Sequence, residues 1–197
     1  MTSSHIIEDA RVARVRELKT ELAAAKGRLA QAEADRDALV SHLHLALMAL
    51  HDFEGLPPDG NFRIIDGWNA ILRCRNVSKL TSENISKLKA DYLANLGIVP
   101  LDPTPSPQPS TLIWIIFDGP EENSFCSGRY RVTYTGGTGL HRADRMILDY
   151  IHAVKLLGLD TSRIDVETGD KALQRRVSAA GAHAEPPAVL PHKSSEP

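Results

Sequence analysis

Four aspartates stand where the sequence predicts that a strand ends or a helix begins. Asp66 and Asp118 end short apolar runs that are typical of buried strands, whereas Asp144 and Asp170 open helical patterns. The carboxyl ends of parallel strands share one edge of a sheet, so we expect these four side chains to converge. Converging carboxylates repel one another, and a bound cation relieves that repulsion.

The chemistry expected of this acidic cluster is metal-assisted hydrolysis of a phosphodiester. Carboxylate oxygens without His or Cys ligands select Mg²⁺ or Mn²⁺. Two such ions about 3.5–4 Å apart activate water and stabilise the leaving oxygen. We expect Asp66, Asp118 and Asp170 to be ligands, and Asp144 to complete the site or orient the attacking water. Asn69, which closely follows the first acid, would hold a carboxylate or a substrate phosphate.

Each member of the cluster also has a plainer interpretation. Asp144 and Asp170 could be helix-capping or first-turn acids, which stabilise a helix by about 0.5–2 kcal/mol. Asp118 followed by Gly119 could be an ordinary turn. Asp66 is harder to explain in this way, because a turn requires no further Asn before the helix. The set of four is therefore more specific than any of its members.

Strands and helices alternate along the part of the chain that carries these acids. Apolar or alternating runs predict the strands, and amphipathic spacing predicts the helices. The predicted strands are 62–66, 111–117, 129–134 and 164–168, and the predicted helices are 82–96, 143–157 and 171–180. This alternation indicates an α/β fold with a mostly parallel sheet flanked by helices.

A long N-terminal helix is predicted to precede this fold. Residues 5–52 contain no proline, and apolar side chains recur at alternating steps of three and four. The positions are Val15, Leu18, Leu22, Ala25, Leu29, Ala32, Arg36, Leu39, Leu43, Ala46 and Leu50, of which Arg36 alone is not apolar. Such a repeat predicts a left-handed coiled coil, which we expect to form a homodimer. The alternatives are a helix that packs back on its own domain and an arm that binds another protein.

The predicted organisation has four parts. These are a coiled-coil helix over 1–52, a linker over 53–60, a globular domain over 61–184 and a disordered tail over 185–197. Two prolines, Pro57 and Pro58, prevent the helix from continuing. The tail is rich in proline and serine, a composition that does not bury enough apolar surface to fold.

Composition limits the classes of function. A net charge of −2 over 197 residues gives no polycationic character, so nucleic-acid binding requires a local basic patch or a bound metal. Cys74 and Cys126 have no metal-ligand spacing, and we expect free thiols in a reducing compartment. No apolar run reaches the ~18 residues of a membrane span, and charged residues stand where a signal peptide has its apolar core. We expect a soluble cytoplasmic protein that does not enter a membrane.

The motifs around the four acids resemble those of a known family. They are Asp66-Gly67-Trp68-Asn69, Phe117-Asp118-Gly119, Arg142-Ala143-Asp144-Arg145-Met146-Ile147 and Glu167-Thr168-Gly169-Asp170-Lys171-Ala172-Leu173. Over residues 61–184 this order is similar to that of NYN domains of the YacP-like branch, which have PIN-like ribonuclease folds. The resemblance implies a metal-dependent nuclease that acts on RNA. The chain departs from some PIN-like members at Ala172, where they carry a further acid.

Basic residues beside the acidic motifs are the expected substrate-binding groups, because RNA phosphates must approach an acidic edge. The candidates are Arg73, Arg129, Arg131, Arg142, Arg145, Lys171 and Arg175. Trp68 could stack on a base or pack in the core. The leading expectation is thus a Mg²⁺- or Mn²⁺-dependent endoribonuclease. The alternative is a non-catalytic RNA-binding or scaffolding module that oligomerises and recruits a protein partner through its coiled coil.

Overall fold

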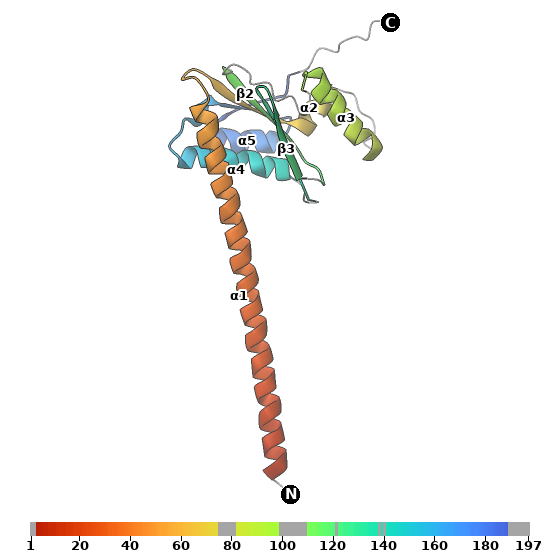
Figure 1. Ribbon diagram of the computed structural model, residues 1–197, viewed down its shortest axis with the longest axis vertical. Helices are drawn as coiled ribbons and strands as arrows, with labels where there is room; N and C mark the ends of the chain where they lie inside the picture. Colours follow the sequence, from red (N-terminus) through yellow and green to blue (C-terminus); the bar gives the residue numbers. More distant parts are fainter. Residues whose placement is uncertain are drawn as a thin grey trace. The chain divides into compact units, whose positions relative to one another are not determined.

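The computed structural model describes residues 3–74, 82–98, 110–120, 122–137, 139 and 141–188. Its elements in chain order, drawn in Figure 1, are α1 (Ser3–Glu54), β1 (Asn61–Asp66), α2 (Gly67–Cys74), α3 (Ser82–Asn95), β2 (Thr111–Phe117), β3 (Glu122–Ser127), β4 (Tyr130–Thr135), α4 (Arg142–Leu156), the 3-10 turn η1 (Thr161–Arg163), β5 (Ile164–Glu167), α5 (Lys171–Ala180) and β6 (His183–Glu185). Every strand and helix that the sequence predicts is present, with bounds within one residue of the prediction for the globular part.

The described strands form one sheet in the order β3-β4-β2-β1-β5-β6. Neighbouring strands are parallel, except that β3 and β4 pair antiparallel. The predicted α/β fold with a mostly parallel sheet is therefore confirmed. From β1 the chain winds outward to β2 and β4, and it then returns to β5 on the other side of β1. Ligands of open α/β sheets bind at the carboxyl ends of the strands where the winding reverses, which here is the end of β1.

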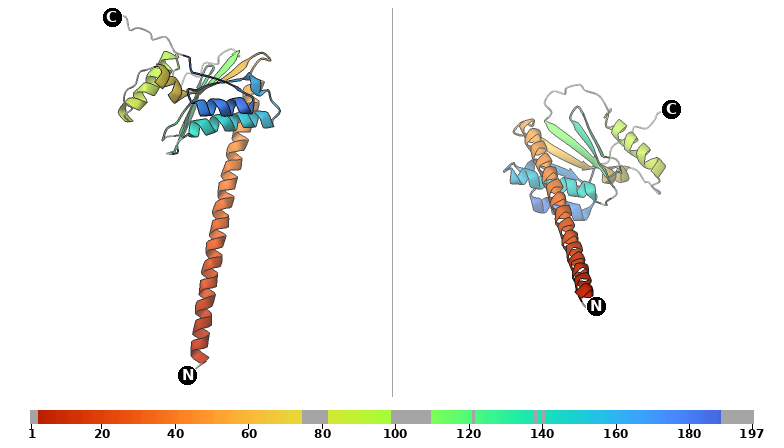
Figure 2. Two further views of the ribbon diagram at one scale, coloured as in Figure 1. Left: turned by 180° about the vertical axis from the view of Figure 1, so that it is seen from behind. Right: turned by 60° about the horizontal axis from the view of Figure 1, so that its bottom comes forward.

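Helices cover both faces of the sheet (Figures 1 and 2). On one face, α4, α5 and the last turns of α1 enclose a core in which the Tyr150 ring lies 5.1 Å from that of Phe62 and 5.2 Å from that of Trp114. On the other face, α2 and α3 pack against the sheet, and Leu88 and Phe117 are both buried there. Burial on both faces explains why the central strands are almost continuously apolar.

The last turns of α1 belong to the globular part of the chain. The chain divides into two compact units, and the second begins at Leu45. Leu45, Ala49 and Phe53 are buried in the core, and so is Leu56 from the predicted linker. The unit boundary thus lies earlier than the predicted boundary between helix and linker. No break in the helical pattern marks it, because one continuous helix crosses it.

Arg131, a predicted substrate-binding residue, is instead held inside this core. Its guanidinium donates two hydrogen bonds to the carboxylate of Asp52, at 2.8 and 2.6 Å. The Tyr150 hydroxyl donates to the same carboxylate at 2.9 Å, and Asp52 is 1% exposed. Burial raises the pKa of Tyr150, so it remains a neutral donor. The charge of Arg131 is therefore committed to a buried ion pair that joins α1, β4 and α4.

Two strands are absent from the prediction. Residues 122–127 of β3 are mostly polar and mostly exposed at the edge of the sheet, and Phe125 alone gives no apolar alternation. Strand β6 is only three residues long, and it includes Glu185, which the sequence assigns to the disordered tail. Glu185 pairs with Glu167 of β5. The proline-rich segment 101–109 and the tail from 189 lie outside the described residues.

In the part of the chain that the structure describes, no helix is both long enough and apolar enough to cross a bilayer. The longest, α1, alternates apolar and charged side chains over most of its length.

Candidate active site

Asp66 is the last residue of β1, and it is 4% exposed. Its Oδ2 accepts hydrogen bonds from Asn69 Nδ2 at 2.5 Å and from Thr168 Oγ1 at 2.9 Å. The backbone N–H of Asn69 donates to Oδ1 at 3.3 Å. Burial raises the pKa of Asp66, the hydrogen bonds from Asn69 and Thr168 oppose the rise, and the charge of Asp144 adds to it. The carboxylate is thus fixed in direction, and its ionised form would be stabilised by a cation.

Two glycines permit the close packing around Asp66. A Cβ on Gly169 would lie 2.7 Å from Asn69 Oδ1, so a larger residue would push the amide away from the carboxylate. A Cβ on Gly67 would overlap the ring of Phe117. The Asp-Gly pair at the end of β1 is therefore required by packing against β2, in addition to any turn preference.

Asp118 follows β2 and is anchored through both its carboxylate and its carbonyl. Its Oδ1 accepts hydrogen bonds from the backbone N–H of Ala143 at 2.7 Å and from Thr135 Oγ1 at 3.1 Å. Its carbonyl oxygen accepts from Trp68 Nε1 at 3.1 Å and from Lys89 Nζ at 3.0 Å. The bond to Ala143 ties the end of β2 to the first turn of α4, which carries the next acid.

Lys89 places a buried cation beside this site. The residue is 8% exposed, and its Nζ lies 5.0 Å from the ring centroids of Trp68 and Tyr134 and 5.4 Å from that of Phe117. Burial lowers the pKa of Lys89, and the negative charge of Asp118 opposes that shift. Cation–π attraction favours this enclosure by aromatic rings. Trp68 is thus half-buried in this cluster rather than fully available for base stacking.

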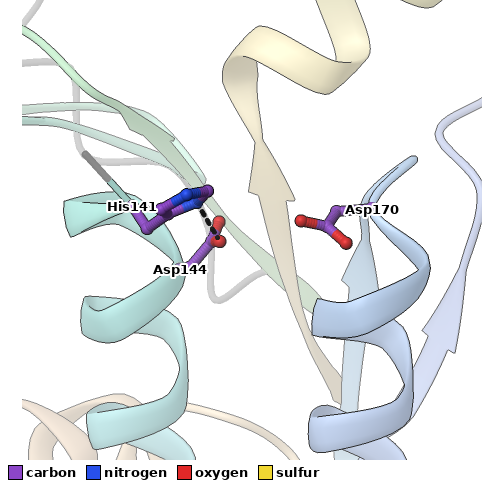
Figure 3. Close-up of side chains that lie close together, drawn as sticks. All are labelled: His141, Asp144 and Asp170. Carbon is purple, nitrogen blue, oxygen red and sulfur yellow. Dashed lines mark hydrogen bonds and ion pairs between the residues drawn. The ribbon is translucent and has the colours of Figure 1, made fainter.

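Asp144 and Asp170 face each other from two different helices (Figure 3). Asp144 lies in the first turn of α4, and Asp170 caps α5 by accepting a hydrogen bond from the backbone N–H of Ala172 at 2.6 Å. His141 precedes α4 in a left-handed conformation with φ of 59°, and its Nδ1 lies 3.1 Å from Asp144 Oδ2. One ligand atom from each of His141, Asp144 and Asp170 lies within 4.8 Å of the others, which is close enough for one metal ion.

Electrostatic interactions link the four acids to one another. Burial raises the pKa of Asp144, His141 lowers it, and the negative charges of Asp170 and Asp118 raise it again. The charge of Asp144 in turn acts on Asp66. Asp144 therefore lies within electrostatic range of the other three acids at the carboxyl edge of the sheet. Among the described residues, only Asp144 and Asp170 of the predicted four belong, with His141, to a group whose ligand atoms are close enough for one metal ion.

Four of the predicted substrate-binding residues lie on the helices that begin at this edge. Arg142 and Arg145 are in the first turn of α4, and Lys171 opens α5. Arg142 Nη2 donates to the backbone carbonyl of Thr135 at 2.8 Å, which holds that side chain against the end of β4. Arg175 lies one turn further along α5, where its Nε donates to the Lys171 carbonyl at 3.2 Å. These four side chains are exposed enough to meet a phosphate backbone.

Arg73, Arg129 and Arg131 do not lie at the acidic edge. The backbone carbonyl of Arg129 accepts a hydrogen bond from the N–H of Ile113 near the start of β2, whereas Asp118 follows the end of that strand. Because β4 runs parallel to β2, its first residues lie at the amino edge of the sheet. Arg73 is exposed in the last turn of α2, at the far end of that helix from Asp66. For these three arginines, closeness to an acid in the sequence therefore does not predict closeness to the acidic site in the fold.

Three residues of the site are absent from the predicted set. Thr168 links two of the acids, because its hydroxyl donates to Asp66 at 2.9 Å and accepts from the backbone N–H of Asp170 at 3.1 Å. Its place within the last acidic motif is a signal that could have identified it. His141 directly precedes the predicted helix start, which is a weaker signal. Lys89 has none, because a lysine in an amphipathic helix is normally a surface residue.

Comparisons with known proteins do not assign a function to this chain. The chain matches no protein family, and no curated protein matches it. Among solved structures, a mutant of Rae1 (YacP) from Bacillus subtilis is similar in fold, with a TM-score of 0.40 and 17% sequence identity. The match covers 64% of this chain and 69% of that one. At this level of similarity no residue's role carries over from one protein to the other.

Proposed function

We propose that this protein is a divalent-metal-dependent ribonuclease that hydrolyses phosphodiester bonds of RNA. The observation that carries the proposal is the group of His141, Asp144 and Asp170, whose ligand atoms lie within 4.8 Å of one another, with the charge of Asp118 acting on Asp144 and that of Asp144 on Asp66. Acids gathered in a buried or half-buried site are costly unless a cation neutralises them. Mg²⁺ and Mn²⁺ held by carboxylates commonly bind substrate phosphates as well.

The donor atoms fit these two ions. Carboxylate oxygens are hard ligands, and Asp144 and Asp170 each offer one within 4.8 Å of the other. His141 adds an imidazole nitrogen to the same group, and transition metals accept this ligand more readily than Mg²⁺ does. The set therefore favours Mn²⁺ of the two ions. A bound ion would lower the pKa of a water molecule and stabilise negative charge on the phosphate.

The chain's own residues hold the reacting groups in position. Asn69 and Thr168 orient the Asp66 carboxylate, and the Ala143 backbone N–H orients that of Asp118. The Asp170 carboxylate is held by the first turn of α5. Arg142, Arg145 and Lys171, exposed at the starts of α4 and α5, would supply positive charge to the phosphate backbone of a bound RNA.

RNA cleavage tests this proposal. A labelled single-stranded RNA is incubated with Mn²⁺ and either the full chain or the Asp144→Asn variant. We expect cleavage by the wild type and a rate lower by about 100-fold or more for the variant, because a metal ligand is lost. Asp149→Asn, on the same helix but outside the site, is the matched control and should retain the wild-type rate. Equal cleavage by wild type and Asp144→Asn would assign the activity to another source and reject the proposal.

A second candidate is a non-catalytic RNA-binding module that recruits a protein through its N-terminal helix. The observation that favours it is the exposed apolar surface of α1, where Leu22 and Leu29 are 56% and 60% exposed. RNA cleavage in the presence of Mn²⁺ distinguishes these two candidate functions. RNA binding that persists without any cleavage at saturating Mn²⁺ would support the second and contradict the first.

A further inference from the structure

Apolar side chains run along the surface of α1 in the first compact unit. They are Val15, Leu18, Leu22, Leu29, Leu39 and Leu43, with exposed fractions of 46–69%. Every side chain from residue 13 to residue 44 is exposed. Helices in proteins are stabilised mainly by burial of an apolar face, so a face of this length requires a partner.

The spacing of this face assigns heptad positions. With Val15 at position a, the a positions are Val15, Leu22, Leu29, Arg36 and Leu43, and the d positions are Leu18, Ala25, Ala32, Leu39 and Ala46. The flanking e positions include Lys19, Lys26, Glu33 and Val40, and the flanking g positions include Arg14, Glu21, Arg28, Asp35 and His42. Gly27 falls at the outward-facing f position, where its lack of a side chain costs no contact at the seam.

A parallel pair of these helices would be poorly matched. Equivalent positions face each other in that arrangement, so Arg36 would meet Arg36 of the second copy within the apolar seam. Ala25 and Ala32 would each face the same alanine of the second copy. These small side chains would leave the seam underpacked between layers filled by leucine. At the flanks, where g faces e, Arg14 would lie opposite Lys19, whereas Glu21 would meet Lys26 and Arg28 would meet Glu33. Arg36, the alanine layers and the contact of Arg14 with Lys19 are therefore what disfavour the parallel pair.

An antiparallel pair is matched in both size and charge. In the register that sets Leu29 opposite Ala32, each a residue faces a d residue, and Arg36 lies opposite the small Ala25. Leu22 then meets Leu39. The alanine layers are filled by larger side chains of the second copy, and the Arg36 stem has room to extend to solvent.

The charged flanks agree with this register. In an antiparallel pair e faces e and g faces g, which sets Lys26 opposite Glu33 and Arg28 opposite Asp35. No like charges face each other among the e and g residues named above. Twofold symmetry makes each contact occur twice.

We propose that residues 13–44 form an antiparallel two-stranded coiled coil with a second copy of this chain. The second copy is the partner because the face is complementary to itself in size and charge in one register. The proposal is independent of nuclease activity, and its tests measure association alone.

A charge reversal at one contact tests the register. Sedimentation equilibrium of the full chain gives the dissociation constant of the dimer. Lys26→Glu or Glu33→Lys alone places like charges opposite each other at two symmetric contacts, and each should raise the dissociation constant about tenfold. The double variant reverses both signs and should restore the wild-type value. Lys26 and Glu33 are two helical turns apart in one chain, so contacts within a single helix cannot explain the rescue. Lys19→Glu, which faces the uncharged Val40, is the matched control and should change little.

A parallel dimer predicts the opposite pattern. The two reversals would then create like-charge contacts with Glu21 and Arg28 independently, so the double variant would be the weakest. Lys19→Glu would tighten that dimer, because it would remove the repulsion from Arg14. Either result overturns the antiparallel arrangement. A wild-type chain that remains monomeric throughout the concentration range overturns the pairing altogether.

Disulfide cross-linking tests the direction independently. The background is the Cys74→Ser/Cys126→Ser chain, into which Leu22→Cys and Leu39→Cys are introduced in separate preparations. Oxidation of a mixture of the two should give a cross-linked dimer, and oxidation of either alone should give little, because positions 22 and 39 face each other. Efficient cross-linking of Leu22→Cys alone would indicate a parallel pair and contradict the proposal.

Discussion

The carboxylate of Asp118 accepts a hydrogen bond from the backbone N–H of Ala143 at 2.7 Å, and this contact fastens the end of β2 to the first turn of α4. Asp144 is the next residue, so the bond also constrains the separation of two acids. Asp66 is held in a similar way by Asn69. The carboxylates thus repel one another while their hydrogen bonds keep them from turning away. A divalent cation would relieve the repulsion without requiring the site to rearrange.

Mn²⁺ should raise the melting temperature of the full chain. A ligand that binds only the folded state stabilises it by about 2.7 kcal/mol at 100 times its Kd. The Asp118→Asn/Asp170→Asn variant should show little of this increase in calorimetry, because two carboxylates of the site are gone. Asp59→Asn/Asp149→Asn removes the same charge outside the site and should respond like the wild type. An equal increase for both double variants would show that Mn²⁺ binds elsewhere.

The stability of the metal-free protein should depend on pH through the site. Burial is the main cause that raises the pKa of Asp66 and of Asp144 above the ordinary value of 3.8. Each carboxyl therefore binds its proton more tightly in the folded protein than in the unfolded chain. Ionisation of these carboxyls therefore lowers the free energy of unfolding. This loss is absent below pH 3.8, grows as the pH rises from 3.8 to the raised pKa, and is complete above that pKa.

Urea unfolding at a series of pH values between about 4 and 7 measures this dependence. The free energy of unfolding of the wild type should fall with rising pH relative to that of Asp66→Asn/Asp144→Asn, which cannot ionise at these positions. The comparison cancels the titration of groups elsewhere. A constant difference between the two proteins across this range would contradict the raised pKa values.

Gly169→Ala should weaken metal binding by displacing Asn69. The new Cβ would lie 2.7 Å from Asn69 Oδ1, so the amide must leave the Asp66 carboxylate or the backbone must shift. We expect Mn²⁺ affinity in calorimetric titration to fall by about 10–100-fold, as is usual when a group that orients a ligand is lost. Gly139→Ala introduces a Cβ at an ordinary 3.6 Å from Arg142 and serves as the control.

The Asn69→Ala background separates this cause from general strain. In that background Gly169→Ala has no amide to displace, so it should add little to the effect of Asn69→Ala alone. If the two effects add in full, the collision with Asn69 is not the reason for the loss.

Arg131→Met should destabilise the fold without impairing the site. The substitution leaves the Asp52 carboxylate buried without its charged partner, at a cost of about 3–5 kcal/mol in the free energy of unfolding. Adding Asp52→Asn should recover part of that loss, whereas Arg129→Met on the surface should change stability by no more than about 0.5 kcal/mol. A stable Arg131→Met variant with weakened RNA binding would restore the substrate-binding role that the structure disfavours.

The positions of the four acids follow from the sequence because two simple rules determine them. Short apolar runs locate the central strands, and parallel strands bring their carboxyl ends to one edge. Asp66 and Asp118 are therefore placed by strand ends, and Asp144 and Asp170 by helix starts. The long N-terminal helix can also be predicted from the sequence, because its apolar repeat continues over many turns.

The contacts that the sequence does not reveal join residues distant in the chain or depend on side-chain packing. Arg131 lies on an alternating strand that predicts an exposed face, yet Asp52 from the end of α1 covers it. Lys89 is enclosed by aromatic rings from three other elements. His141 reaches Asp144 only through a left-handed backbone conformation, which a non-glycine residue seldom adopts. The periodicity of apolar residues in the sequence does not predict such contacts.

Anomalous diffraction from Mn²⁺-soaked crystals would show directly whether a metal ion binds among the four carboxylates. We expect a manganese peak bonded to carboxylate oxygens of Asp144 and Asp170, with Asp66 and Asp118 joined to it directly or through ordered water. The peak should disappear in crystals of Asp144→Asn soaked in the same way. A soaked wild-type crystal with no peak among these carboxylates, or with manganese bound only elsewhere, would contradict the assignment of a metal-dependent active site.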